Sequence, residues 1–575
     1  MAKVITDEQN YQDIANAIRA KLGSADTYTP SEMAAAIGAI SGGGADSPLD
    51  PEVVYLSTRP ADWLKMPTAQ TGEAYFLIHT PATSPDGVLV NMSFSGRNGD
   101  SVTAEYGTSG SDGVFVPDSS MSQTWNITTF SQTINVGRVI PANAFGSLTS
   151  DGFKQIIMKI SWTAPSGYAS LGGNSRANGG IASSTVEIAM DVSGLNACFL
   201  GNGSQSSYAS PWAIRYAKLS GTPAGYSPRF MNLFSGCYKL LCVRSLFDLS
   251  NVANISNFFQ DCYSLISLPA ISTSAVTNIS NAFQNCYSLR AIPSINLPNV
   301  TSLSYLFQYC GSLTNADGLV CAPTNMYWAF SSCNSLSHTP TGIDYSHVTS
   351  LESTFASSGI QGAVSLSLPA ATNCYGMFSN CRLISEVTLT NMSSVTNLYQ
   401  AFTNCASLRR ANISATPACT NFGNIFYGCT SLDQLPVLDT SACTNASQMF
   451  YNVPLHRFDL SQYDFKQITS TSGLSAIATM FGQNIVIIGD TFGANGITNT
   501  GQMISLAGNF GSASVDIKIA KTDAMLQLAA NATTVFSSTS SVIVYVPDNL
   551  LATYQADSYW STLGDRLKGY SDWPY

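Results

Sequence analysis

The chain has 575 residues, a formal net charge of −10 and 10% charged residues, far below the ~25% of an average globular protein. This length predicts more than one domain. The acidic balance without a basic cluster argues against nucleic acid as a partner. No run of 18 apolar residues is present, which excludes a helix that inserts into a membrane.

The first segment, residues 1–40, predicts a helical hairpin. An apolar stripe at helical spacing runs from Tyr11 to Leu22, and Thr29-Pro30-Ser31-Glu32 has the form of a capping box that starts a second helix. So small a hairpin has too little core to stand alone, so we expect it to anchor the chain on a partner or on copies of itself. A local helical cap on the next domain is the alternative. Residues 41–49 predict a Gly/Ser linker. The start, MAKVITDEQN, has no apolar signal region, so we expect no signal peptide.

Residues 50–225 predict a β-sandwich. Short apolar runs such as Ala74–Ile78 and Val186–Met190 alternate with clusters of Gly, Ser, Asn and Asp. Trp63 and Trp125 are of the residue type that stacks on sugar rings, but we favour packing in the core for both.

A repeat of about 24 residues fills residues 226–455 and is the strongest signal in the sequence. In NAFQNCYSL (281–289) and AFTNCASL (401–408), Phe precedes Cys by three residues and Leu follows Cys by three. The Phe recurs ten times at intervals of 23 to 25 residues, at Phe234, Phe259, Phe283, Phe307, Phe330, Phe355, Phe378, Phe402, Phe426 and Phe450. Such a period is typical of a solenoid, in which stacked repeats bury columns of like side chains.

The spacing within one repeat predicts a short helix followed by a short strand. Ile279, Ala282, Phe283 and Cys286 lie at i, i+3, i+4 and i+7, which favours a helical turn with one apolar face. The Leu-x-x-apolar segment that follows favours a strand. We expect Cys to fill its column as a small, buried, reduced thiol, and disulfides are the less favoured alternative.

After Phe450 the period ends. Residues 456–545 are expected to continue the solenoid with irregular strands, for example at Ile485–Ile488 and Val515–Ile519, and residues 546–575 to form a C-terminal cap. The expected fold class is therefore a mixed α+β, multi-domain chain with a helical hairpin, a β-sandwich and a capped solenoid.

Three stretches resemble known families. The Phe-x-x-Cys frame resembles the BspA-type leucine-rich repeat family over about residues 227–455, which implies a leucine-rich-repeat solenoid with a role in surface recognition or adhesion and no catalysis. The stretch IANAIRAKLGSADTYTPSEMAAAIGAI (14–40) resembles a segment of tail and baseplate-associated proteins of phages of Gram-positive bacteria. The stretch from Tyr55 to Leu64 resembles part of phage tail fibre proteins.

We expect a binding protein with no catalytic residues, no cofactor and no metal. The four His residues lack metal-ligand spacing, and no nucleophile motif is present. Solenoids bind through exposed positions that vary between repeats. On the strand side these candidates are Arg290, Asn315, His338, Glu386, Arg409, Arg410, Asp433 and Gln434. On the other side the candidates are the aromatic residues Tyr305, Tyr327, Trp328 and Tyr399.

The resemblances imply a phage virion protein of the tail fibre or baseplate that is assembled in the host cytoplasm. It is expected to attach to other tail proteins through its N-terminal segment and to recognise a glycan or protein of the host cell surface. A bacterial cell-surface adhesin of the BspA type and a purely structural virion protein are the alternatives. A carbohydrate-active enzyme with its site in residues 50–225 is a more distant one. A homo-oligomer is also left open, with a trimer as the form common among tail fibres.

Overall fold

The computed structural model describes residues 55, 59–81, 88–90, 92–136, 139–173, 185–200, 214–225, 228–468, 478–480, 484–489, 504–506, 515–526 and 542–575. The helical hairpin predicted for residues 1–40 and the linker predicted for residues 41–49 lie outside the described residues. The chain divides into two compact units. Unit 1 comprises the described residues of Met1–Val300 and Tyr309–Cys321, and unit 2 those of Thr301–Gln308 and Ala322–Tyr575.

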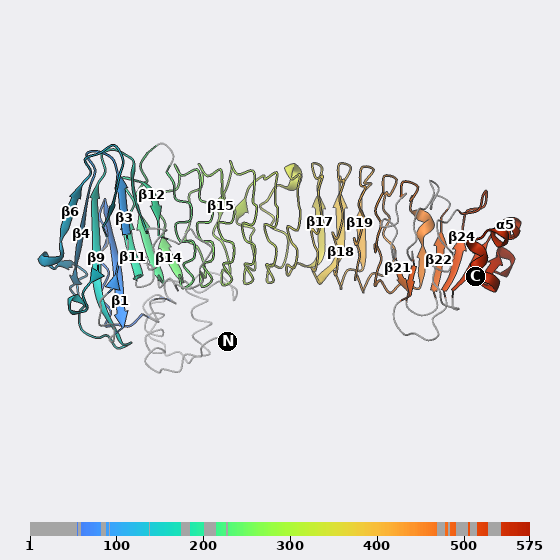
Figure 1. Ribbon diagram of the computed structural model, residues 1–575, viewed down its shortest axis with the longest axis horizontal. Coiled ribbons are helices and arrows are strands. Elements are labelled where there is room, and N and C mark those ends of the chain that lie inside the picture. The colour runs from blue at the N-terminus through green and yellow to red at the C-terminus, as the bar shows by residue number, and fades with distance from the viewer. Residues whose placement is uncertain are drawn as a thin grey trace, which may run out of the picture. The chain divides into compact units, whose positions relative to one another are not determined.

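The described chain is mostly β, so the predicted mixed α+β class is wrong (Figure 1). Apart from a helical conformation at Tyr55, the only α-helix within the described residues is α5 (Leu551–Ala556). The elements of unit 1 are β1 (Glu73–Pro81), β2 (Val88–Leu89), β3 (Met92–Gly96), β4 (Ser101–Ser109), β5 (Phe115–Pro117), η1 (Ser119–Met121), β6 (Gln123–Asn126), β7 (Gln132–Asn135), β8 (Val139–Ile140), η2 (Ala142–Ala144), β9 (Phe153–Thr163), β10 (Ala169–Gly173), β11 (Thr185–Asp191), β12 (Leu195–Phe199), β13 (Tyr216–Ser220), β14 (Cys242–Ser245), β15 (Ile295–Asn296) and β16 (Leu319–Val320). Those of unit 2 are η4 (Tyr345–His347), β17 (Gln361–Ser367), β18 (Leu383–Thr390), β19 (Arg410–Ile413), β20 (Arg457–Asp459), η5 (Leu460–Gln462), β21 (Ala478–Met480), β22 (Asn484–Ile488), β23 (Ile504–Leu506), β24 (Val515–Ile519), β25 (Val542–Val546), η7 (Asp548–Leu550), α5, η8 (Trp560–Arg566), β26 (Leu567–Gly569) and η9 (Tyr570–Asp572).

Two sheets form the N-terminal part of unit 1. The larger has the strand order β14-β13-β11-β1-β9-β4-β5 with β6 paired to β4, and the smaller has the order β12-β10-β3-β7. Burial alternates along β3, where Met92 and Phe94 are buried, and along β4, where Val102 and Tyr106 are buried. Each sheet therefore has one face against protein, as the predicted sandwich requires.

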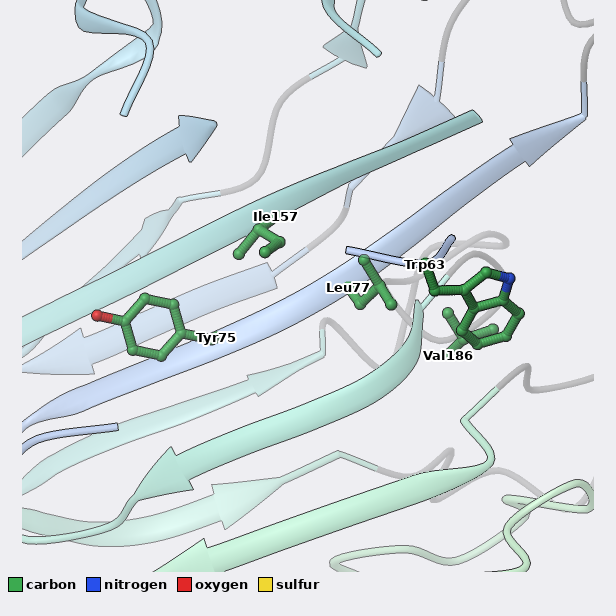
Figure 2. Close-up of a cluster of buried hydrophobic side chains, with 5 residues drawn as sticks. All are labelled: Trp63, Tyr75, Leu77, Ile157 and Val186. Atoms are coloured by element: carbon green, nitrogen blue, oxygen red, sulfur yellow. The ribbon is translucent and has the colours of Figure 1, made fainter. Parts of the chain in front are cut away.

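Strand β1 is buried on both faces, which explains its continuous apolar sequence. Phe76 is fully buried on one face. Figure 2 shows the cluster that includes residues of the opposite face, made of Trp63, Tyr75, Leu77, Ile157 and Val186. Trp63 is 5% exposed, so its predicted place in the core is confirmed.

The two sheets change to parallel pairing where the repeats begin. Strands β11, β13 and β14 pair in parallel in the larger sheet, and β10 and β12 do so in the smaller sheet. Single bridges then extend the smaller sheet from Ala197 to Arg229, Asn254 and Asn278. Within unit 1, the sheets thus continue directly as the sides of the solenoid turns.

His79 is a buried imidazole at the edge of the Trp63 cluster. The backbone N–H of Leu64 donates to Oε1 of Gln155 at 2.7 Å, so the amide nitrogen of Gln155 faces the ring and lies 2.7 Å from Nε2 of His79. An amide nitrogen can only donate, so this Nε2 accepts and carries no proton. Burial is the main cause that lowers the pKa of His79 to about 4, and the positive charges of Arg215 and Arg59 add to it.

The buried His79 predicts an acid-sensitive unit 1. Its pKa lies near 6.5 when unfolded and about 4 when folded, so the unfolded state binds a proton first as the pH falls. Stability should therefore drop between pH 6.5 and pH 4, by about 3 kcal/mol in all. Denaturant unfolding at pH 7 and pH 4 measures this drop. It should shrink in His79→Gln and persist in His456→Gln, a change at an exposed position. An unchanged drop in His79→Gln would assign the acid sensitivity to other groups.

The segment around each repeat Phe is a sequence of turns, so the predicted short helix is wrong. In all ten repeats the residues two before and two after the Phe have positive φ, for example Gln400 and Asn404, each at 58°. A left-handed residue ends a right-handed helix, so two of them four residues apart leave no room for one. Most of these positions hold Asn, Asp or Gly, the residues that adopt this conformation most easily.

Hydrogen bonds and ring stacking join each turn to the next. The backbone N–H of Phe402 donates to Ile425 at 3.0 Å and that of Phe426 donates to Met449 at 3.1 Å, both in the following turn. Within unit 2, the Phe402 ring stacks on those of Phe378 and Phe426 with centroids 6.0 and 5.7 Å apart. The repeat Phe residues are buried in both units, which confirms the predicted column.

The cysteines of the repeats have a polar role as well as an apolar one. All fourteen cysteines are buried, and none of them forms a disulfide. The thiol of Cys405 donates to the carbonyl of Phe378 at 3.2 Å, and that of Cys429 to the carbonyl of Phe402 at 3.1 Å. The same bond recurs from Cys262, Cys286, Cys310, Cys333 and Cys381. The column therefore favours a small side chain that both packs tightly and donates weakly.

Thiol chemistry tests this burial. Burial raises the pKa of Cys381 to about 11 and that of Cys429 to about 12, and the thiolate is the reactive form. We expect none of the fourteen cysteines to react with an aromatic disulfide reagent within minutes at pH 8, and all of them to react in denaturant. Counting released thiol by absorbance measures both numbers. Fast reaction of several native thiols would show that the column opens readily.

Beyond the repeats, unit 2 ends in a parallel sheet. Its order is β20-β22-β24-β25-β26, which confirms the strands expected at 485–488 and 515–519. The helix α5 follows β25. Trp560 is fully buried and donates from Nε1 to the carbonyl of Leu526 at 2.9 Å. The end of the chain thus covers apolar side chains that a bare solenoid end would expose.

Candidate binding surface

The strand-side candidates are distributed over both units. Arg290 and Asn315 lie in unit 1 and are exposed. The other six lie in unit 2, where all are exposed except the half-buried His338. Register pairs Glu386 of β18 with Arg410 of β19.

The charges on this side compensate one another. Asp433 lies 3.7 Å from the guanidinium of Arg409 and 3.9 Å from that of Arg410. Arg409 and Arg410 are more than half exposed, and exposed pairs of this kind contribute little to stability. The strand side therefore offers a neutral, mostly polar surface.

Two shallow grooves lie in unit 2 on this side. One, of about 320 Å³, is lined by side chains of 388–390, 411–414 and 434–437, including Gln434. The other, of about 390 Å³, is lined by residues 339–346 and 365–367. Val437 is 77% exposed beside the first groove. Their linings combine polar side chains, chiefly Thr and Ser, with an equal share of apolar ones, and contain one charged side chain, Asp344.

The four aromatic candidates come together in unit 2. With one further residue, they form what we call the aromatic stripe: Tyr305, Tyr327, Trp328, Tyr375 and Tyr399. All five are half-buried. The rings of Tyr305 and Tyr327 meet edge to face with centroids 5.1 Å apart, and those of Tyr375 and Tyr399 stack with centroids 5.5 Å apart.

A ladder of Asn residues positions the stripe. Asn325, Asn373 and Asn397 lie in one line of bridges, in which Ser350 occupies the turn between the first two. The side-chain oxygen of each Asn accepts from the backbone N–H two residues later, which belongs to Tyr327, Tyr375 and Tyr399 respectively, at 3.0 to 3.1 Å. Such Asx turns fix the backbone locally. The three tyrosines therefore start from equivalent points of their turns.

The stripe ends where a glycine makes room for a ring. A Cβ atom on Gly423 would lie 2.9 Å from Cδ2 and Cε2 of Tyr399. The ring of Tyr399 thus packs on the backbone of the following turn. Two stripe residues, Tyr305 and Trp328, also have positive φ, which is uncommon for bulky residues.

Sequence reasoning missed Tyr375 and Glu352. Both lie three residues before a repeat Phe, as Tyr327 and Tyr399 do. Counting residues back from each Phe would have placed all four in one row. The predicted helix concealed this row, because helical geometry assigns successive residues to other faces of the repeat than the observed turns do.

The phenols of Tyr305 and Tyr375 stay protonated at neutral pH. Burial, and then a hydrogen bond with Tyr327, raise the pKa of Tyr305 to about 12. The pKa of Tyr375 is raised by burial and then by the electrostatic effect of neighbouring groups, which include Glu352. The rings of these two residues therefore carry no phenolate charge.

The described part of the chain shows neither a metal centre nor a membrane-spanning helix. Within the described ranges, no group of three or more His, Cys, Asp and Glu residues is placed to hold a metal ion. In the same part of the chain, no helix has the length and apolar character needed to cross a membrane.

Comparison with known proteins finds likeness in the repeats. The model of a family described as "Mycoplasma protein of unknown function, DUF285" matches residues 229–319, 372–488 and 420–541, which together are less than half of the chain. No curated protein is similar to this chain in sequence. The match supports the repeat family predicted from the Phe-x-x-Cys spacing.

One solved structure is also similar. It is a leucine-rich cell surface protein from Faecalibacterium prausnitzii A2-165 with 17% sequence identity. The likeness covers 47% of this chain and 90% of that chain, at a TM-score of 0.23. So low a score does not establish a shared overall arrangement. Neither likeness is to a phage tail protein.

Proposed function

We propose that this chain is a binding protein without enzymatic activity that recognises a glycan or protein of a cell surface through the aromatic stripe. The supporting observation is that five half-buried aromatic side chains from four solenoid turns lie together in unit 2. Tyr and Trp are enriched in binding sites because they bury large areas at low entropic cost. The neutral strand side adds polar groups for hydrogen bonds.

The biological setting that we propose is a phage virion, with the chain in the tail fibre or baseplate. The resemblance of residues 14–40 and 55–64 to phage tail proteins supports it. The N-terminal segment would attach to other tail proteins after assembly in the host cytoplasm. A bacterial surface adhesin of the BspA type is the second candidate, which the Phe-x-x-Cys repeat supports. A purely structural virion protein is the third.

The stripe is tested by cell binding. The fluorescently labelled full chain should bind to cells of its bacterial host, and Tyr375→Ala combined with Tyr399→Ala should weaken binding at least tenfold, because each aromatic anchor contributes roughly 1–2 kcal/mol. Tyr287→Ala is the matched control, since Tyr287 is an exposed tyrosine of unit 1 whose ring contacts that of a neighbouring tyrosine. Flow cytometry over a range of concentrations gives the affinities. Equal binding by the double variant and the control would remove the stripe from the proposal.

Electron microscopy tests whether the protein is part of a phage virion or of a bacterial surface. Gold-labelled antibody against residues 226–575 is applied to a phage lysate and to uninfected cells. Label on particle tips supports the virion, and label on the walls of uninfected cells supports the adhesin. Release of reducing sugar from host cell wall by the purified chain would contradict a function without catalysis.

A further inference from the structure

A single carboxylate, Glu352, lies within the aromatic stripe. It takes the same place in its turn as Tyr327 in the turn before and Tyr375 in the turn after, since all three lie three residues before a repeat Phe. The line of bridges from Asn325 through Ser350 to Asn373 confirms that these turns are neighbours. Glu352 therefore separates the Tyr305–Tyr327 pair from the Tyr375–Tyr399 pair.

Among the described residues, Glu352 has no positively charged partner. None of the described Lys and Arg residues forms an ion pair with it. Arg382 is the only Lys or Arg in the sequence between Arg290 and Arg409. The amide of Asn373 donates to Oε2 of Glu352 at 3.0 Å and holds the carboxylate in place. The side chain is half-buried, so its charge is only partly screened by water.

The charge of Glu352 reaches both aromatic pairs. It raises the pKa of Tyr305 on one side and that of Tyr375 on the other, in each case after the larger effect of burial. The site thus combines electron-rich ring faces with one fixed negative charge. Anionic glycans are disfavoured by that charge, and within the described ranges Glu352 belongs to no group of three or more His, Cys, Asp and Glu residues that could hold a metal ion.

We propose that the aromatic stripe and Glu352 together bind an organic ammonium group of the surface ligand. This inference rests on the proposed function and names the chemistry of its ligand. Ring faces attract ammonium groups through their quadrupole, and a nearby carboxylate strengthens the attraction. Solenoid turns repeat at about 4.8 Å, so the turns of Tyr327 and Tyr375 are roughly 10 Å apart, which is enough for an alkylated ammonium head between them.

Two matched pairs of small molecules test whether the site prefers a positively charged ligand. Choline is compared with its neutral analogue 3,3-dimethylbutan-1-ol, and glucosamine with N-acetylglucosamine, each titrated into the full chain and followed by ligand-detected NMR. We expect choline or glucosamine to bind with millimolar affinity and its neutral partner about tenfold more weakly or not at all. The choline arm represents a quaternary amine, and the glucosamine arm an amino sugar.

Variants assign the effect to Glu352. In Glu352→Gln the difference between charged and neutral ligands should shrink to the part that the rings alone contribute, while Asp248→Asn, which changes an exposed carboxylate of unit 1, should leave it intact. Tyr375→Phe, which retains the ring, should also leave it intact. Equal binding of charged and neutral ligands by the wild-type chain overturns the inference, as does an unchanged preference in Glu352→Gln.

Failure of this inference is distinguishable from failure of the proposed function. If neither ammonium compound binds but the tyrosine double variant still loses cell binding, the stripe recognises another chemistry and the inference alone is wrong. If the double variant keeps full cell binding while choline binds in a Glu352-dependent way, the ammonium site stands and the proposed receptor role of the stripe is wrong.

Discussion

Replacing Phe402 with Ala should lower the free energy of unfolding of unit 2 by about 3–5 kcal/mol. The Phe402 ring is fully buried and lies nearly parallel to those of Phe378 and Phe426, at interplanar angles of 14° and 8°. Its removal leaves a cavity inside a stack whose backbone is held by hydrogen bonds from both sides, so the turns cannot close over it. Denaturant unfolding followed by circular dichroism gives the change.

The control for Phe402 is a change that retains most of the volume. Phe402→Leu should cost clearly less than Phe402→Ala, since it leaves a smaller cavity. Equal costs for the two variants would mean that ring stacking, and not filled volume, stabilises the column. A cost below about 1 kcal/mol for Phe402→Ala would mean that neighbouring turns collapse into the space.

Replacing Arg59 with Met should destabilise unit 1 by about 3–5 kcal/mol. Glu187 is 3% exposed and pairs with Arg59 through Nε at 2.5 Å and Nη2 at 3.2 Å. Tyr55 donates its hydroxyl to the same carboxylate, and burial together with that carboxylate raises the pKa of Tyr55. Without Arg59 the carboxylate is left buried with no compensating charge. Thermal or denaturant unfolding of unit 1 measures the loss.

A double-mutant cycle separates the pair from its surroundings. If Arg59→Met destabilises unit 1 because the Glu187 carboxylate is left buried without its partner, then adding Glu187→Met should restore at least half of the lost free energy of unfolding. The reason is that a buried ion pair and an apolar pair are often similar in stability. Additive costs in the double variant would show that Arg59 acts through its contact with the Leu64 carbonyl at 2.6 Å and the Trp63 ring.

The incorrectly predicted helix shows that the spacing of apolar residues does not by itself determine the backbone conformation. Burial at i, i+3, i+4 and i+7 is satisfied by Ile279, Ala282, Phe283 and Cys286, all of which are buried. A turn with left-handed residues at Asn281 and Asn285 places the same four side chains inward. The Asn residues were the available signal, because Asn adopts positive φ more readily than most residues.

The aromatic stripe was predictable in most of its members but not in its arrangement. Tyr305, Tyr327, Trp328 and Tyr399 were identified from their residue type, and the structure brings them into one stripe. Tyr375 and Glu352 were missed, since their place depends on the register between turns. The strand-side candidates stay predictions of a binding role, and the structure shows that Arg409, Arg410 and Asp433 partly neutralise one another.

By itself, the sequence determined the period of the solenoid, the columns of Phe, Cys and Leu, and the strands of the C-terminal sheet. These follow from which side chains avoid water, and that preference is a property of each residue and its spacing. The tertiary structure alone decided that each repeat is a series of turns and that the carboxylate of Glu352 lies between two pairs of tyrosines. The physical reason is that the backbone N–H groups of repeat Phe residues donate to the next turn, as Phe402 does to Ile425. Such bonds join residues more than twenty positions apart, and no local pattern in the sequence reports them.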